Sequence, residues 1–197
     1  MKVGVLALQG DVPEHLAALA SQLPGTYPRP VRRPADLDGL EALFLPGGES
    51  TTIARLLEEG GLWNPLAARI RGGLPVLATC AGFILLSSRL DPAPGGRNPR
   101  TWGILDVTVR RNDYGGQRES FEDVVRVEGL EGGPFPGVFI RAPRVLSVGA
   151  GATPFAWRGE EIVGVRSGAV WGLTFHPELS GDPRIHRLFL EVAARKR

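Results

Sequence analysis

The sequence predicts an α/β fold, namely a Rossmann-like three-layer sandwich with a mostly parallel central sheet and an antiparallel flank. Two observations predict it. Over the first 90 residues, short apolar runs alternate with helical segments of about 10–15 residues, which is typical of a parallel sheet with helices on both faces. After residue 100, short β-like runs follow one another with turn residues between them, which indicates an antiparallel extension of the same sheet.

The first half of the chain is expected to form strands separated by helices. Asp11 and Glu14 have the spacing of a capping box at the start of the first helix. Pro46, Gly47 and Gly48 end an apolar strand before the second helix begins. The expected strands cover residues 2–8, a short stretch near residue 31, 42–45 and 75–78, and the expected helices cover 11–23, 49–59, 62–71 and 81–88.

The second half is expected to add strands and to close with a helix. The β-like runs cover residues 104–110, 121–127, 138–141, 145–148, 161–166 and 169–175. Ser167 and Gly168 lie between the last two runs and predict a hairpin turn. Residues 182–194 carry apolar side chains at helical spacing, from Ile185 to Val192, and predict an amphipathic helix. We expect residues 1–197 to form a single domain.

Composition and charge argue against several classes of protein. The net charge is +2 and the basic residues are scattered along the chain, so nucleic acid is not an expected partner. No apolar run approaches the ~20 residues of a membrane span, and no membrane association is expected. The single cysteine cannot form an internal disulfide, which agrees with a cytoplasmic location. The only lysines are Lys2 and Lys196, which leaves no interior amine for imine chemistry.

The single cysteine, Cys80, lies where an apolar strand is expected to turn abruptly into a helix. Such a turn needs small neighbours, and Ala78 and Gly82 flank Cys80 at two residues on either side. The turn presents the thiol at the edge of the sheet and directs the first N–H groups of the helix, beginning with Ala81, toward the group under attack. A lone cysteine in apolar surroundings can equally be a buried packing residue.

A histidine and a carboxylate follow the last β-like run. In extended backbone, His176 and Glu178 would point to the same face, and Pro177 favours extended backbone at His176. A thiol needs a base to become a thiolate, and the base needs a third group to orient it. Cys80, His176 and Glu178 are therefore candidates for these three roles, although each could be structural. His15 and His186 fall inside expected helices without such partners and are interpreted as structural.

Three further segments carry candidate binding residues. Gly47, Gly48 and Glu49 join a strand to a helix, where free N–H groups can hold an anion. An oxyanion formed from a carbonyl suits this loop better than a phosphate, because the loop lacks a P-loop lysine and Glu49 is acidic, and a plain turn is the alternative. Arg111 and Arg141 each end a β-like run and could bind a carboxylate or lie solvated at the surface.

Seven motifs, in order, together resemble the family of glutaminase subunits of pyridoxal 5′-phosphate synthase, which are class I, or triad, glutamine amidotransferases. The motifs are VLALQGDVPEH, LPGGESTT, ATCAG, RRNDYG, ESFE, VFIRAP and FHPEL. Two departures from the family pattern are mild: Ala78 stands where glycine is frequent, and RNDYG stands where the family has an RNSFG-like loop.

The resemblance implies the fold, the activity and the roles of named residues. It implies a Cys80, His176 and Glu178 triad that hydrolyses L-glutamine to glutamate and ammonia through a γ-glutamyl thioester. It implies that the glutamine contacts are Gly47, Gly48, Glu49, Arg111, Ile140 and Arg141, and that the oxyanion hole is formed by Gly48 and Ala81, with Gln9 adjacent.

The resemblance also implies a partner. The ammonia is expected to pass to a separate synthase subunit in a hetero-oligomer, and pyridoxal 5′-phosphate is then a product of the complex, so no cofactor of this chain is expected. No cluster of residues at metal-ligand spacing is visible in the sequence, and no metal is expected. The alternatives are a class I glutaminase serving another acceptor, a triad cysteine hydrolase such as a peptidase of the same fold, and a non-catalytic docking subunit.

Overall fold

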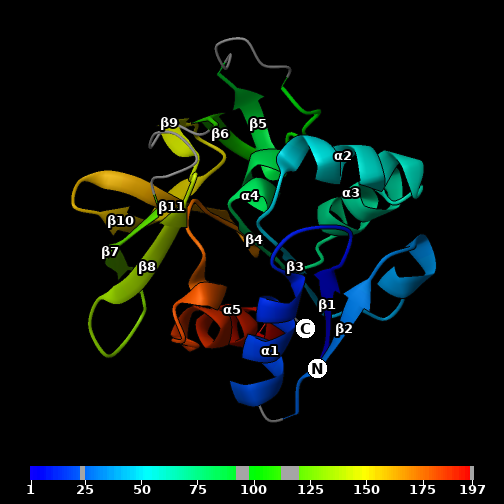
Figure 1. Cartoon of the computed structure of the whole chain (residues 1–197), viewed down its shortest axis with the longest axis horizontal. Coiled ribbons are helices and arrows are strands. Elements are labelled where there is room, and N and C mark those ends of the chain that lie inside the picture. Colours follow the sequence, from blue (N-terminus) through cyan, green and yellow to red (C-terminus); the bar gives the residue numbers. More distant parts are fainter. Residues whose placement is uncertain (23–24, 92–97, 112–119, 196–197) are drawn as a thin grey trace.

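The computed structural model describes residues 1–22, 25–91, 98–111 and 120–195, and within them a nine-stranded sheet separates two groups of helices (Figure 1). Five neighbouring strands of this sheet are parallel, and the other four continue it in antiparallel fashion. In spatial order the strands are β2 (Tyr27–Val31), β1 (Lys2–Leu6), β3 (Ala42–Leu45), β4 (Val76–Thr79), β12 (Val170–Leu173), β11 (Glu161–Ser167), β10 (Thr153–Arg158), β7 (Ser120–Val127) and β8 (Phe135–Ile140).

A second, smaller sheet packs beside the first. It contains β5 (Ser87–Leu90), β6 (Leu105–Arg110) and β9 (Arg144–Val148). The helices are α1 (Val12–Gln22), α2 (Ser50–Glu59), α3 (Trp63–Arg71), α4 (Ala81–Leu86) and α5 (Arg184–Ala194), with short 3₁₀ turns η1 (Pro34–Leu37) and η2 (Pro177–Leu179). Among the described residues, no helix is both long enough and apolar enough to cross a membrane.

Two hydrophobic cores lie on opposite faces of the large sheet, as the alternation of side chains along a strand requires. In β3, Leu43 and Leu45 belong to the core that α2, α3 and α4 cover. Ala42 and Phe44 belong to the core that α1 and α5 cover. The predicted three-layer α/β sandwich with an antiparallel flank is therefore confirmed.

Several predicted boundaries are wrong for identifiable reasons. The helix predicted at 81–88 ends at Leu86, because Ser87 adopts an extended backbone and begins β5, which pairs with β6. Strand β10 was not predicted, since Pro154 and a β-bulge at Ala156 interrupt its pattern. Ser167 pairs with Val170, so the residues of the predicted hairpin turn are 168–169 and not 167–168.

Candidate active site

The carboxyl ends of three adjacent parallel strands converge on one edge of the large sheet. β4 pairs with β3 on one side and with β12 on the other. The segments that follow these strands carry Gly47 and Gly48, Cys80, and His176, respectively. Ligands of open α/β sheets bind outside the carboxyl ends of the strands, so this edge is where a site is expected.

Cys80 occupies a sharp turn between β4 and α4. Its backbone has φ 46° and ψ −103°, a left-handed conformation that residues other than glycine seldom adopt. Its N–H donates to the carbonyl of Leu173 at 2.9 Å, which fixes the turn to β12. Gly82 has to be small, because a Cβ there would overlap the carbonyl of Leu45. Cys80 is 6% exposed, and its Sγ lies 3.9 Å from the carbonyl oxygen of Ile140.

His176 and Glu178 form a buried pair. The Nδ1 of His176 lies 2.8 Å from Oε1 of Glu178. The backbone expected between them is wrong, because Pro177 begins the 3₁₀ turn η2 and the strand does not continue to Glu178. The turn still brings the carboxylate to the ring. Burial raises the pKa of Glu178, and the hydrogen bond with His176 acts against that rise.

Asp11 supplies a second carboxylate to the same ring nitrogen, which the sequence did not reveal. Its Oδ2 lies 3.2 Å from Nδ1 of His176. The capping-box spacing with Glu14 had assigned Asp11 to the start of α1, and that signal concealed the long-range contact. Burial alone would lower the pKa of His176, but its interactions with Asp11, Cys80 and Glu178 raise it well above its usual value.

The other ring nitrogen of His176 faces the cysteine side of the site. Its Nε2 is buried and makes no hydrogen bond with any described residue. His176 and Cys80 line the same cavity, and Cys80 contributes to the raised pKa of His176. A donor and acceptor in an unliganded site are often loosely aligned, so a free Nε2 beside a thiol is the arrangement expected of a base awaiting substrate.

The cavity beside Cys80 has a volume of about 120 Å³. This is well below the roughly 300–1,000 Å³ of pockets that take drug-sized ligands, so the cavity suits a small molecule. It is lined by Asp11, Gly48, Glu49, Ser50, Cys80, Ile84, Arg111, Ile140, Arg141 and His176. Six predicted residues therefore share this cavity with Cys80, and Asp11, Ser50 and Ile84 are additions; the six are Gly48, Glu49, Arg111, Ile140, Arg141 and His176.

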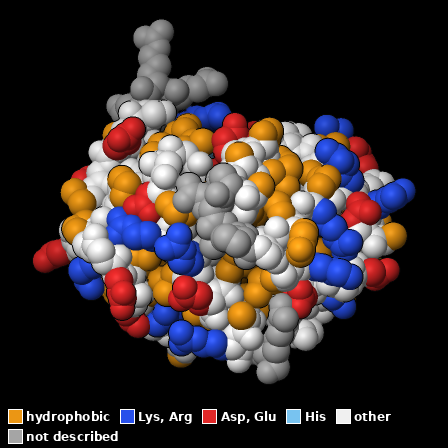
Figure 2. Space-filling model, turned by 90° about the horizontal axis from the view of Figure 1, so that it is seen from below, with side chains coloured by type: hydrophobic (Ala, Val, Ile, Leu, Met, Phe, Trp, Pro, Cys, Tyr) orange, Lys and Arg blue, Asp and Glu red, His pale blue; other side chains and the backbone are white. Residues whose placement is uncertain are grey.

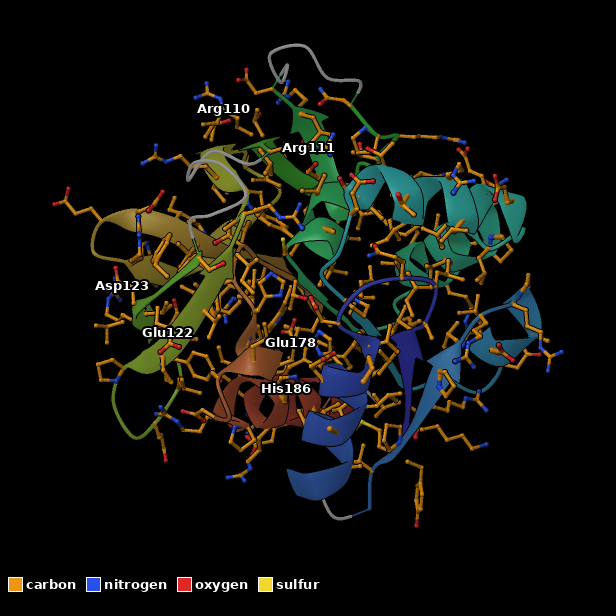
Figure 3. All side chains as sticks on the ribbon, in the orientation of Figure 1. Arg110, Arg111, Glu122, Asp123, Glu178 and His186 are labelled. Carbon is orange, nitrogen blue, oxygen red and sulfur yellow. The ribbon has the colours of Figure 1, made fainter. Side chains whose placement is uncertain are left out.

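Glu49 and Arg111 are paired with each other at this cavity. The Nη2 of Arg111 lies 3.1 Å from Oε1 of Glu49. Glu49 also caps α2, accepting hydrogen bonds from the N–H groups of Thr51 and Thr52 at 3.1 and 2.7 Å. Partial burial acts to raise the pKa of Glu49, but these hydrogen bonds outweigh it and the pKa lies below its usual value. Figure 3 shows Arg111 at the end of β6. An ionised Glu49 beside Arg111 offers one charge of each sign, which is what binding the ammonium and carboxylate groups of an α-amino acid requires.

Three predicted residues, Gln9, Gly47 and Ala81, do not line the cavity but lie next to residues that do. Gln9 accepts a hydrogen bond through Oε1 from the N–H of Glu49 at 2.8 Å, which braces the Gly48 loop. Gly47 has to lack a side chain, because a Cβ there would overlap the His176 ring. Ala81 is the first residue of α4, where N–H groups have no partner inside the helix. Arg141 has φ 43° and is exposed. Residues 112–116 of the RRNDYGG segment lie outside the described residues.

Three donor atoms that could hold a metal come from Asp11, His176 and Glu178, and they lie within 4.8 Å of one another. Both carboxylates, however, are in contact with the same Nδ1 of His176. A proton between nitrogen and carboxylate satisfies this geometry, whereas a metal needs the lone pair of that nitrogen. The three residues therefore fit a protonated histidine held by two carboxylates better than they fit a metal site.

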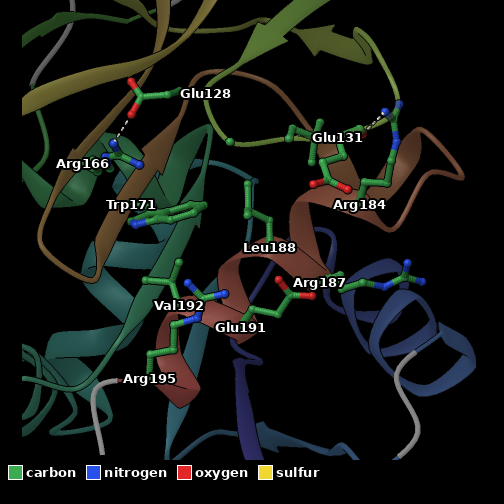
Figure 4. A pocket seen from close by; sticks show the side chains of 12 residues that line it. Glu128, Glu131, Arg166, Trp171, Arg184, Arg187, Leu188, Glu191, Val192 and Arg195 are labelled. Carbon is green, nitrogen blue, oxygen red and sulfur yellow. Dashed lines mark hydrogen bonds and ion pairs between the residues drawn. The ribbon is translucent and has the colours of Figure 1, made fainter.

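A larger hollow of about 590 Å³ lies at the other end of β12, against α5 (Figure 4). Two of its four arginines are engaged by neighbours: Arg166 pairs with Glu128 at 2.6 Å, and Arg184 donates to the carbonyl of Glu131 at 2.9 Å. Cys80 and His176 do not line it. On the face shown in Figure 2, basic and acidic side chains are interspersed without a stripe of one sign.

Comparison with known protein families gives a match over residues 5–195 to the model of the SNO glutamine amidotransferase family. The chain is 53% identical over 196 residues to the pyridoxal 5′-phosphate synthase subunit PdxT of Streptomyces coelicolor, covering 99% of this chain and 95% of that protein. It is 49% identical over 199 residues to the subunit of the same name from Acidothermus cellulolyticus, covering 98% and 94%.

Two solved structures are similar to this chain over nearly its whole length. A crystal structure described as a glutamine amidotransferase superposes with a TM-score of 0.88 at 47% identity, covering 98% of each chain. The structure of PurLQS from Thermotoga maritima superposes with a TM-score of 0.68 at 18% identity, which is a likeness of fold alone.

Proposed function

The chain belongs to the SNO glutamine amidotransferase family, and from this premise we propose that it is the glutaminase subunit of pyridoxal 5′-phosphate synthase. It hydrolyses L-glutamine to L-glutamate and ammonia, and the ammonia serves vitamin B6 biosynthesis. The single observation that carries the chemistry is the convergence of Cys80, on a strained turn, with a buried His176 whose Nδ1 contacts carboxylates and whose Nε2 is free.

In the first half-reaction, Nε2 of His176 already holds the proton of the Cys80 thiol when glutamine binds, and the thiolate attacks the side-chain carboxamide carbon of glutamine. The raised pKa of His176 favours the imidazolium that results. The N–H groups of Gly48 and Ala81 hold the oxyanion, and one such donor contributes roughly 3 kcal/mol. The imidazolium then protonates the amide nitrogen, the C–N bond breaks, and ammonia leaves a γ-glutamyl thioester.

In the second half-reaction, Nε2 of His176 takes a proton from water, and the resulting hydroxide attacks the thioester carbon. The same two N–H groups hold the second oxyanion, the C–S bond breaks, and the thiolate regains a proton from the imidazolium. Glu178 orients the ring throughout and stabilises its positive charge. The α-carboxylate and α-ammonium groups of glutamine pair with Arg111 and Glu49, while Gly47, Ile140 and Arg141 complete the binding site through their backbone.

The assembly around this chain is part of the proposal. The relatives named as synthase subunits support a hetero-oligomer in which a separate synthase subunit receives the ammonia. Pyridoxal 5′-phosphate is then a product of the complex, and this chain needs no cofactor or metal of its own. Residues 1–197 act as one glutaminase domain. We place the enzyme in the cytoplasm, where a reducing environment keeps Cys80 a free thiol.

The test is ammonia release from glutamine by the purified chain, alone and with a candidate synthase subunit. Stimulation by the synthase and complete loss in Cys80→Ala are the expected results. Ammonia release that survives Cys80→Ala contradicts the thioester mechanism. If no synthase stimulates or co-purifies, the assignment to pyridoxal 5′-phosphate synthesis fails, and hydrolysis of glutamine then points to another acceptor.

A further inference from the structure

A second buried histidine lies directly behind the candidate triad. His15 is on α1 and His186 on α5, and both are fully buried. The Nε2 of His15 lies 3.4 Å from Oε2 of Glu178 and 3.3 Å from Oγ1 of Thr79. Its Nδ1 lies 3.3 Å from Nε2 of His186. Both histidines lie in helices as expected, but His15 contacts a carboxylate that its sequence context did not indicate. Figure 3 labels Glu178 and His186 close together, where α1 and α5 meet.

Glu178 needs a donor on the side that His176 does not reach. Its Oε1 is bonded to His176, but its Oε2 is buried and makes no hydrogen bond of standard geometry with a described residue. An unsatisfied buried carboxylate oxygen is costly. The N–H of His15 at 3.4 Å can satisfy it with a small adjustment of either side chain.

The surroundings of His15 select one tautomer. Burial lowers the pKa of His15 well below its usual value, and the neighbouring His186 and His176 act in the same direction, so the ring is neutral. A neutral ring has one N–H and one lone pair. A lone pair on Nε2 would face the negatively charged Oε2 of Glu178 and be repelled by it. A proton on Nε2 would instead be attracted to that oxygen. The lone pair then falls on Nδ1, where it accepts from Nε2–H of His186.

The other ring nitrogen of His186, Nδ1, agrees with that assignment. With its proton on Nε2, His186 carries a bare lone pair on Nδ1, and this Nδ1 is buried without a partner among the described residues. An unpartnered acceptor is less costly than an unpartnered donor of a charged ring, and burial lowers the pKa of His186 to about 4, so it too is neutral. His186 also stacks on Phe44, with ring centroids 5.4 Å apart.

We propose that His15 is a positioning residue, which donates its Nε2–H to Oε2 of Glu178 and so keeps that carboxylate ionised and oriented toward His176. The proposal rests on the proposed glutaminase function. The same Nε2–H lies 3.3 Å from Oγ1 of Thr79, the residue before Cys80, so this one N–H is shared between the carboxylate and the strand that carries the nucleophile. From α1, His15 thus contacts Glu178 on one side of the site and Thr79 on the other, and it does not touch the substrate. The titratable groups that face this arrangement are Glu178 and His176 after β12, His186 on α5, and Asp11 before α1.

The first test uses the unmodified chain and needs no activity. Nitrogen-15 chemical shifts of the histidine rings identify which nitrogen carries the proton. We expect His15 and His186 to be neutral with the proton on Nε2 between pH 6 and 8, and His176 to be protonated on both nitrogens. A proton on Nδ1 of His15 would place the lone pair toward Glu178 and would overturn the proposal.

The second test compares two substitutions in the complex with its synthase subunit. His15→Gln keeps an amide N–H within reach of Glu178, and His15→Leu removes it. We expect kcat to fall by about 10-fold in His15→Leu and by less than about 3-fold in His15→Gln, the scale of one hydrogen bond to a charged group, with KM changed by less than about 2-fold in both. Without the donor, the pKa of Glu178 rises further and its hold on the imidazolium weakens. The rise of the Cys80 alkylation rate with pH should therefore move to higher pH in His15→Leu.

A matched control separates positioning from stability. Leu19 is buried one turn further along α1 and belongs to the same core. Leu19→Ala should lower the stability without changing kcat per folded enzyme or the alkylation profile. Equal kcat losses in His15→Leu and His15→Gln, or an unchanged profile, would contradict the proposal. An unmodified complex that releases no ammonia refutes the glutaminase function instead, and the tautomer measurement still decides the role of His15.

Discussion

The two ends of β12 carry their charged side chains in opposite ways. Beyond its carboxyl end, the side chains of His176 and Glu178 are 4% and 0% exposed, and both Glu178 and Asp11 contact the same ring nitrogen of His176. At its amino end, the side chains of Arg166 and Glu128 are 29% and 54% exposed, although they too form an ion pair. Water weakens an exposed pair, whereas burial shifts the pKa of a group and makes it available for proton transfer. We therefore propose that the chemistry takes place in the smaller hollow, beside the more deeply buried pair, although the hollow at the other end is larger.

The largest effect that this comparison predicts comes from the buried carboxylate. Glu178→Gln keeps the size of the side chain but removes the charge that stabilises the imidazolium. We expect kcat for glutamine hydrolysis to fall by about 10³-fold, somewhat less than the loss of a triad carboxylate usually costs, because Asp11 still contacts Nδ1 of His176. Steady-state kinetics of the complex check this. A loss below about 10-fold would show that the buried end does not depend on this charge.

A second prediction concerns stability at acid pH. The folded protein keeps His186 neutral with a pKa of about 4, while the unfolded chain titrates near 6.5. This contribution is fully present above pH 6.5 and is lost as the pH falls toward about 4, and its size is roughly 3 kcal/mol. His186→Phe retains a ring on Phe44 and should flatten the acid decline of the unfolding free energy, measured by urea denaturation across that range. Part of the acid decline should remain in this variant, because burial also lowers the pKa of His15. A decline as steep as that of the unmodified protein would contradict the buried neutral state of His186.

A third prediction tests the second carboxylate on His176. Asp11→Asn removes a charge that raises the pKa of His176, so the imidazolium should be lost at lower pH. We expect the rate of Cys80 alkylation at neutral pH to fall by about 5-fold, the scale of one charge-assisted hydrogen bond. The measurement is the pH dependence of inactivation by iodoacetamide. Asp182→Asn is the matched control, because Asp182 pairs with Arg184 away from the cavity and should leave the profile unchanged.

The smallest effect is expected at the amino end of β12. Arg166→Ala breaks the exposed pair with Glu128 and should lower the unfolding free energy by less than about 1 kcal/mol. Neither kcat nor KM for glutamine should change, because no described cavity joins the two ends. Denaturation curves and kinetics of the same preparation check both statements. A 10-fold loss of kcat would mean that the larger hollow communicates with the site.

The parts of the site that the sequence predicted are those built by local geometry. Cys80 could be placed because a strand, a tight turn and a helix are contiguous, and Ala78 and Gly82 mark the turn. Gly47 and Gly48 could be placed for the same reason. The catalytic and binding roles of these residues remain predictions, while the fold and the family are established.

The parts that escaped prediction depend on contacts between distant segments. His15 reaches Glu178 from a helix near the start of the chain, and nothing in the local pattern of α1 indicates which side chain lies against α5 and η2. Asp11 had a sufficient local explanation as a helix cap. Strand β10 forms only because β7 and β11 lie on either side of it, and that pairing overrides its weak local pattern.

The hydrogen bond from Cys80 N–H to Leu173 has a consequence for the order of folding. β4 and α4 leave the ribosome long before β12, so an incomplete chain holds the thiol without its base and without the carbonyl that fixes its turn. His176 is in turn tied through its N–H to Val138 on β8, at 2.8 Å, which joins the far edge of the sheet to the site. These long-range contacts form slowly in folding. A nascent chain therefore lacks the proposed site until the whole sheet has formed.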